Sequence, residues 1–133
     1  MTLYINTTNG EKVEIGLYDG EKLAKTRKFA AKYKQSEKLL PEIDKLLKSV
    51  KKSPKDIHAI VVVKGPGPFT AVRVGVATAN ALGYSLRIPV VGVKKESNSH
   101  ASIVAILKKW NGSWTPKQTV EPFYGKEPSV TIK

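Results

Sequence analysis

Hydrophobic and polar positions alternate through the first thirty residues in the way that β-strands require. Residues 3–5 form a short apolar run, and apolar side chains return at every second position over 13–17. Asp19-Gly20 follows at once, and this dipeptide favours a tight hairpin because glycine tolerates a positive φ. The pattern predicts three antiparallel strands in succession, the third over residues 22–29.

The hydrophobic period then lengthens to that of a helix. Apolar residues at 39, 40, 43, 46, 47 and 50 fall on one helical face. Ser36 has the side chain of a good N-cap, so we expect Pro41 to stand near the start of this helix, where proline is tolerated. Ser53-Pro54 is predicted to end it.

Two further strand and helix pairs complete the pattern. The β-branched run over 57–63 is typical of a strand buried on both faces. After the loop at 65–68, Thr70 can cap a second helix that extends to Leu86. A strand over 88–93 and a helix over 99–109 follow, and the periodic signal then fades.

The predicted element order is therefore β-β-β-α-β-α-β-α. This order indicates an α/β fold with a mixed five-stranded sheet, the ribonuclease-H-like arrangement that also forms a lobe of the actin-like ATPases. At 133 residues the chain has room for one domain. We expect that domain over residues 1–109, followed by a C-terminal tail over 110–133.

The charge of the chain suggests a polyanion as a partner. There are 23 Lys and Arg residues against 11 Asp and Glu, a formal net charge of +12. Basic residues that could contact RNA directly are concentrated at Lys25, Arg27, Lys28, Lys32, Lys34 and Lys38. The same residues could instead form a solvated surface, and the sequence leaves both interpretations open.

Composition also predicts the compartment. The chain has no cysteine, which excludes disulfides and thiolate zinc sites. It shows neither an apolar window long enough to span a bilayer nor a secretory signal at its start. We expect a cytoplasmic protein without membrane contact.

No set of residues in the sequence points to catalysis. A two-metal nuclease of this fold needs acids on its first and fourth strands, but Asn6 stands on the first and residues 57–64 contain no acid. His58 and His100 lack the spacing of a helical metal pair and are expected at the surface. We therefore expect no catalytic residue, no metal and no cofactor.

Two polar turns are candidates for a phosphate contact. Gly65, Gly67 and Thr70 stand between a strand and a helix N-terminus, and Asn6, Thr7 and Thr8 follow the first strand. The first loop lacks the Lys-Ser/Thr ending of a P-loop, and its two prolines remove N–H donors. It is either a rigid turn or a vestigial nucleotide and phosphate loop.

Residues 64–79, K-G-P-G-P-F-T-A-V-R-V-G-V-A-T-A, and residues 88–93, I-P-V-V-G-V, closely resemble the signature of the TsaB (YeaZ) family. The resemblance extends to I-N-T-T at 5–8 and S-E-K-L-L-P-E-I-D at 36–44, and more loosely to 122–128. Asn6, Gln35, Pro68 and Ala71 depart from the Asp, His, Ser and Gly that the family usually has at these positions.

This resemblance implies a non-catalytic scaffold subunit. Such proteins bind a TsaD-like transferase, work with a TsaE-like ATPase, and support threonylcarbamoylation of the adenosine next to the tRNA anticodon, with tRNA as an indirect partner. The alternatives are a homodimer when TsaD is absent and, as a different function, a stand-alone basic RNA-binding domain. The chain has 40 residues after Val93, so we expect a one-lobe member whose tail is the remnant of a second lobe.

The resemblance places the partner interface on the first two helices. The residues expected there are Leu39, Leu40, Ile43, Leu47, Val72, Arg73, Gly75, Val76, Ala79, Asn80 and Gly83. The small residues at 75, 79 and 83 recur every four positions and would let another helix approach closely. The same stripe could instead pack on the chain's own sheet.

Overall fold

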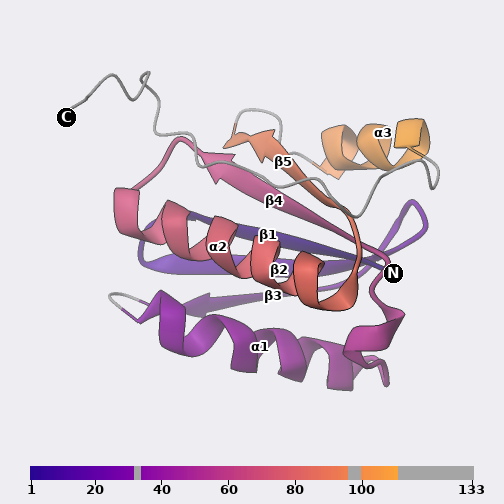
Figure 1. Ribbon diagram of the computed structural model, residues 1–133, viewed down its shortest axis with the longest axis horizontal. Helices are drawn as coiled ribbons and strands as arrows, with labels where there is room; N and C mark the ends of the chain where they lie inside the picture. The colour runs from indigo at the N-terminus through magenta and orange to yellow at the C-terminus, as the bar shows by residue number, and fades with distance from the viewer. Residues whose placement is uncertain (32–33, 96–99, 111–133) are drawn as a thin grey trace.

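A five-stranded sheet carries helices on both faces (Figure 1). The computed structural model describes residues 1–31, 34–95 and 100–110. Within these ranges α1 (Gln35–Ser49) and α2 (Phe69–Leu86) cover one face, and α3 (His100–Trp110) covers part of the other. The predicted α/β class and element order are confirmed.

The first three strands form the predicted antiparallel meander. They are β1 (Thr2–Asn9), β2 (Lys12–Asp19) and β3 (Lys22–Ala30). Gly10 and Gly20 adopt φ values of +75° and +62° in the two connecting turns, which explains why glycine suits both positions. β1 and β2 extend beyond the apolar runs that predicted them, because backbone pairing continues into the flanking polar residues, and β3 ends one residue later than predicted.

Two parallel strands complete the sheet in the order β3-β2-β1-β4-β5. β4 (Ala59–Gly65) pairs with β1, so that Ile5 stands opposite Val62, and β5 (Val90–Lys94) pairs with β4. Residues 60–63 are fully buried, as predicted for a strand covered on both faces. The carboxyl ends of β1, β4 and β5 consequently meet at one edge of the sheet, which we call the carboxyl edge.

The predicted helix caps at Ser36 and Thr70 are wrong. Each is the second residue of its helix, and the cap positions belong to Lys34 and Pro68, whose side chains make no capping bond. α1 begins two residues earlier than a cap at Ser36 would place it, because Gln35 Nε2 donates to Gly10 O at 2.9 Å, and the N–H groups at 37 and 38 donate to Lys34 O. Pro41 is therefore the seventh residue of the helix and lies inside it, not near its start as predicted.

After α1 a short 3₁₀ turn, Pro54–Asp56, leads into β4. The helix predicted over 99–109 is found over His100–Trp110. Apart from Trp110, the predicted tail over 110–133 lies outside the described residues, as does Lys32. None of the helices in the described ranges combines the length and apolarity needed to cross a bilayer.

The sheet separates two hydrophobic cores. The larger core lies beneath α1 and α2 and includes Leu3, Ile15, Leu46, Ile60 and Val72. The smaller core lies beneath α3, where Ile103 packs with Tyr4, Tyr18, Val61, Val63 and Val93. Alternate residues of β1 and β4 point to opposite cores, so these strands contribute to both.

Candidate functional site

The polar residues at the end of β1 are buried and bonded within the chain. Asn6, Thr7 and Thr8 are each at most 1% exposed. Asn6 Oδ1 accepts hydrogen bonds from the Thr8 N–H at 2.9 Å and from Thr8 Oγ1 at 2.6 Å. Thr7 Oγ1 donates to Ala71 O of α2 at 2.6 Å. Thr7 thus fastens the strand to the helix, while the Asn6–Thr8 bonds lie within β1, and all three side chains are buried away from a phosphate in solvent.

The loop over 65–68 lies directly against this strand end. Gly65 adopts φ +121°, and a Cβ on Gly67 would come within 2.8 Å of Thr8 O. The structure thus brings Gly67 directly against Thr8 and leaves no space between them for a ligand. Thr70 is exposed on α2, away from this contact. The arrangement favours the rigid turn, and a phosphate contact by these residues stays a prediction.

The stripe of small residues on α2 packs on the chain's own sheet. A Cβ on Gly75 would overlap Thr7 Oγ1, and one on Gly83 would overlap the Val90 side chain. Ala79 between them is fully buried. The close approach predicted for a partner helix is therefore made to β1 and β5.

The predicted interface set needs a correction for the same reason. Seven of its members besides Ala79 are buried inside this chain: Leu39, Ile43, Leu47, Val72, Gly75, Val76 and Gly83. Helical periodicity identified an apolar face correctly, but that face covers the sheet. Their side chains support the two helices from the inside and are buried within this chain, so they are not on the surface that a partner would meet.

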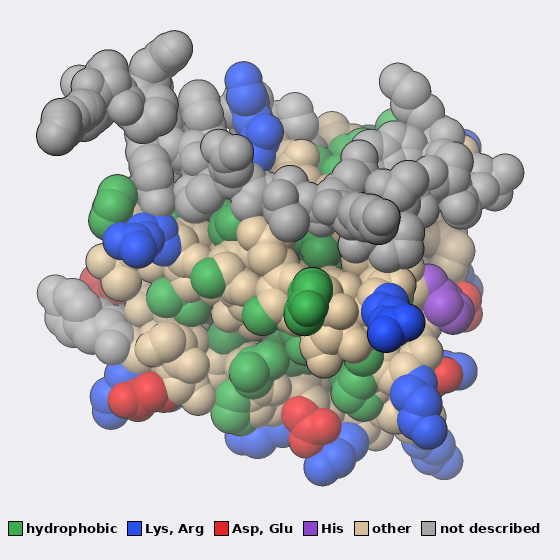
Figure 2. Space-filling view, in the orientation of Figure 1, with side chains coloured by type: hydrophobic (Ala, Val, Ile, Leu, Met, Phe, Trp, Pro, Cys, Tyr) green, Lys and Arg blue, Asp and Glu red, His purple; other side chains and the backbone are tan. Residues whose placement is uncertain are grey.

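The opposite side of α2 is accessible, and we call it the α2 outer face: Phe69, Arg73, Ala77, Asn80 and Tyr84. Phe69 is 56% exposed and Tyr84 88% exposed. The Arg73 guanidinium lies 5.1 Å from the centre of the Phe69 ring, within the range of a cation–π contact. Figure 2 shows hydrophobic side chains over α2 and charged side chains concentrated toward α1.

Three members of the predicted interface set are accessible. Arg73 and Asn80 lie on the α2 outer face, and Leu40 on α1 is 52% exposed. Phe69 and Tyr84 were missed. Positions 69, 73, 77, 80 and 84 share one helical face, and this spacing could have revealed them. The apolar residues of α2 are more numerous on its buried face, so hydrophobic periodicity points to that face instead.

A hollow of 430 Å³ adjoins the α2 outer face where the first turns of α1 and α2 meet. Its lining includes Gln35, Ser36, Phe69, Thr70 and Val74. Since it opens beside an exposed aromatic ring, its shape suits an inserted apolar side chain.

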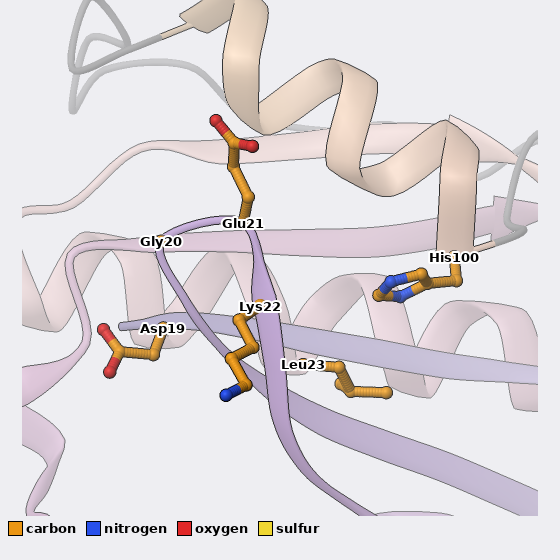
Figure 3. Close-up of a pocket in the computed structure, with 6 residues that line it drawn as sticks. All are labelled: Asp19, Gly20, Glu21, Lys22, Leu23 and His100. Carbon is orange, nitrogen blue, oxygen red and sulfur yellow. The ribbon is translucent and has the colours of Figure 1, made fainter.

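A second hollow of 720 Å³ lies between the β2–β3 turn and α3 and is lined by residues 19–23 and His100 (Figure 3). Tyr18 Oη lies 3.2 Å from His100 Nδ1 and the two rings stack, while Glu21 pairs with Lys108 at 3.7 Å. Burial, and then the Glu14 charge, raise the pKa of Tyr18. These contacts fasten α3 to the hairpin.

Both histidines are exposed, as predicted. His58 Nδ1 lies 3.1 Å from the amino group of Met1, far in sequence from His100 on α3. In the part of the chain that the structure describes, no three His, Asp or Glu side chains are grouped to hold a metal ion.

Comparison with known proteins places this fold in a family. A family model described as "TsaD: tRNA N6-adenosine threonylcarbamoyltransferase" matches residues 29–109, more than half of the chain. The chain is 42% identical over 62 residues to the tRNA threonylcarbamoyladenosine biosynthesis protein TsaB of Bacillus subtilis. It is 36% identical over 99 residues to the TsaB of Buchnera aphidicola from Acyrthosiphon pisum. The chain belongs to the TsaD family, in its TsaB (YeaZ) group.

Each of these two TsaB alignments covers a larger share of this chain than of the relative. They include 47% and 74% of this chain but only 27% and 42% of the Bacillus and Buchnera proteins. The chain therefore spans less than half the length of these curated relatives.

Solved structures agree on the fold. YeaZ from Pseudomonas aeruginosa superposes with a TM-score of 0.65 at 24% identity, covering 72% of this chain and 43% of that one. A second structure, titled as an uncharacterized protein with similarity to peptidase YeaZ from P. aeruginosa, gives a TM-score of 0.67. The TsaB group is thus supported by sequence, and a fold like that of YeaZ is supported by shape.

Proposed function

We propose that this chain is a non-catalytic scaffold subunit in the synthesis of threonylcarbamoyladenosine in tRNA, acting in the cytoplasm by binding a TsaD-type transferase. The observation that carries the proposal is the α2 outer face, together with membership of the TsaB group. A TsaE-type ATPase would join the same assembly.

The α2 outer face has the chemistry of a protein contact. Phe69 and Tyr84 are exposed at its two ends, with Arg73 on the same face. Tyrosine and arginine are enriched among residues that dominate binding energy, and a large exposed apolar group gains most when a partner removes it from water. Leu40 on α1 adds a further exposed apolar side chain.

The rigidity of α2 supports the same conclusion. Thr7 bonds to the first turn of the helix, and Gly75 and Gly83 seat it closely on the sheet. A helix held in this way presents its outer face without a large loss of conformational entropy on binding.

A scaffold role is also consistent with what the described residues offer chemically. The amide and hydroxyls at the end of β1 are bonded internally. Asp19, Glu21 and His100 line the larger hollow, but Glu21 pairs with Lys108 and His100 stacks on Tyr18, and among the described residues these side chains form no group that could hold a metal ion. The geometry supports positioning of another protein better than it supports a reaction.

The test is capture of the purified TsaD-type protein of the same organism by the full chain, compared with its Tyr84→Asp variant. We expect wild-type capture at micromolar concentration and at least a roughly tenfold loss for the variant, because the charge would be buried at the contact. Ala105→Asp, which adds the same charge on the exposed side of α3, is the matched control and should bind normally.

Two results would count against this proposal. One is the absence of any wild-type capture. The other is an equal loss for both variants, which would reflect charge alone. Light scattering of the isolated chain then tells whether the same face forms a homodimer without TsaD, in which case Tyr84→Asp shifts the mass to that of a monomer.

A further inference from the structure

Arg73 is the only charged residue of α2. It is exposed on the α2 outer face, where its neighbours along the face are uncharged. Phe69 stands one helical turn before it, with the centre of its ring 5.1 Å from the guanidinium. The α2 outer face therefore presents one positive charge among apolar, small and neutral polar side chains.

This charge has no counter-charge in the chain itself. Among the described residues, no carboxylate forms an ion pair with Arg73 and no hydrogen bond uses its N–H donors. The guanidinium is therefore hydrated in the isolated chain.

The neighbouring helix α1 has three acids, and each interacts elsewhere. Glu42 accepts a hydrogen bond from Arg27. Asp44 pairs with Lys48 at 2.9 Å within the same helix. Glu37 stands in the first turn of α1, where a negative charge is favourable to the helix dipole. Nothing on α1 is thus held in place for Arg73.

A partner that covers the α2 outer face would take Arg73 out of water. Burial of a guanidinium without an acceptor is strongly unfavourable, because the lost hydration is not replaced. A carboxylate replaces it best, since its two oxygens accept two parallel N–H bonds from the planar group. As this chain supplies no such carboxylate, the partner has to supply it.

The contact with Phe69 is compatible with such a pair. A cation–π contact is made over the face of the ring and uses no hydrogen-bond donor of the guanidinium. Arg73 can therefore keep its contact with Phe69 while its N–H groups bond to a carboxylate. Arginine is suited to interface ion pairs for this reason, and because it is more weakly hydrated than lysine.

A protein carboxylate fits this face better than an RNA phosphate. Binding to a nucleic-acid backbone draws on several cations that follow the phosphates, whereas α2 offers one. The large exposed side chains of the face are Phe69 and Tyr84, with Ala77 between them. One arginine among aromatic and small residues is the composition of a protein contact.

We propose that Arg73 bonds to a carboxylate of the protein that covers the α2 outer face, and that it selects a partner with an acid inside an otherwise apolar surface. That the partner is a TsaD-type transferase rests on the proposed function. A surface with a neutral or basic residue at this point is rejected, because it would leave Arg73 buried without an acceptor or beside a like charge.

The experiment measures the dissociation constant of the purified full chain and the TsaD-type protein of the same organism. The variants are Arg73→Glu and Arg73→Lys. Lys52→Glu is the matched control, because it reverses the same charge at an exposed position beyond the last turn of α1. Circular dichroism checks that each variant folds. In a second step, the exposed acids of the TsaD-type protein are changed singly to Lys and tested against Arg73→Glu.

We expect Arg73→Glu to weaken binding at least about tenfold, because it places two carboxylates together, while Lys52→Glu stays close to the wild type. Arg73→Lys should lose less than Arg73→Glu, since lysine keeps the charge and lacks only the two-pronged geometry. One Lys variant of the partner should bind Arg73→Glu at least about tenfold more tightly than the unchanged partner does.

Three outcomes with wild-type capture intact would overturn this inference and leave the proposed function standing. They are normal capture by Arg73→Glu, an equal loss in Lys52→Glu, and a loss that no charge reversal on the partner restores. A loss of tRNA binding by Arg73→Glu with capture unchanged would also overturn it and assign Arg73 to a phosphate. Absence of wild-type capture would remove the proposed function and this inference together.

Discussion

At the scale of single residues, glycine decides how closely α2 approaches the sheet. Gly75 faces Thr7 and Gly83 faces Val90, and in both places a methyl group would overlap a neighbouring side chain. Thr7 is itself held by its hydrogen bond to Ala71 O, so it has little freedom to turn away. The two glycines therefore set the distance between the helix and the strands.

We expect Gly75→Ala to lower the free energy of unfolding by about 1–3 kcal/mol, because the added methyl forces a shift in a packed site. The overlap outweighs the gain of up to about 1 kcal/mol that alanine offers in a helix. Ser85→Ala, on the exposed side of the same helix, changes helix propensity without a packing overlap, and it should leave the free energy of unfolding unchanged or slightly higher. Urea unfolding measures both, and a stabilised Gly75→Ala protein would refute the close contact.

At the scale of elements, one ion pair ties α1 to the edge strand β3. Arg27 Nε donates to Glu42 Oε1, and Lys45 approaches the same carboxylate at 3.7 Å. β3 is otherwise exposed along most of its length and has Lys25 and Lys28 beside Arg27. Charged side chains of this kind discourage an edge strand from pairing with other chains.

The ion pair gives stability a dependence on pH. The hydrogen bond from Arg27 holds the pKa of Glu42 below its ordinary value of 4.5. As pH falls, the Glu42 carboxylate therefore takes up a proton at a higher pH in the unfolded chain than in the folded one. The stabilisation that is present above pH 4.5 is lost as the pH falls toward the pKa of Glu42 in the folded chain. Glu42→Gln should make the acid limb of the stability curve shallower and cost at most about 1 kcal/mol at neutral pH.

The measurement is the urea midpoint of both proteins at a series of pH values. Asp44→Asn is the matched control, because Asp44 pairs with Lys48 within the same helix and does not reach β3. An acid limb that Glu42→Gln leaves unchanged would show that the pair contributes nothing to the attachment of α1.

Sequence periodicity predicted the elements well and their surroundings less well. Strands and helices follow from local patterns, so their order and the hairpin at Asp19-Gly20 could be predicted. The first residue of α1 could not be predicted in the same way, because Gln35 is held at the helix start by a hydrogen bond to Gly10, which is distant in sequence. The burial of Val72 and Val76 was equally hidden, since the sequence does not tell which helical face the sheet covers.

At the scale of the whole molecule, two cores share one sheet. Tyr4, Val61 and Val63 face α3, while their neighbours in the same strands face α1 and α2. Disturbing one core therefore displaces backbone that the other core needs. The sheet should make the described fold unfold as a single cooperative unit.

Ile103→Ala tests this coupling from the smaller core. Ile103 is 1% exposed, and its truncation should cost about 2–5 kcal/mol as a buried large-to-small substitution. Unfolding followed by far-ultraviolet circular dichroism and by the NMR signals of Tyr4 and Tyr18 should give coincident transitions, both shifted to lower denaturant. Separate transitions would show that α3 detaches by itself and that the cores are independent.

The fastening of α2 to the end of β1 also has a mechanical consequence. Thr7 bonds to the first turn of the helix and Gly83 seats its last turn on Val90, so the helix is anchored at both extremities. A partner that binds the exposed side of α2 therefore contacts a helix that is held directly against β1 and β5. We therefore expect α2 to keep its position on the sheet when a partner binds its outer face.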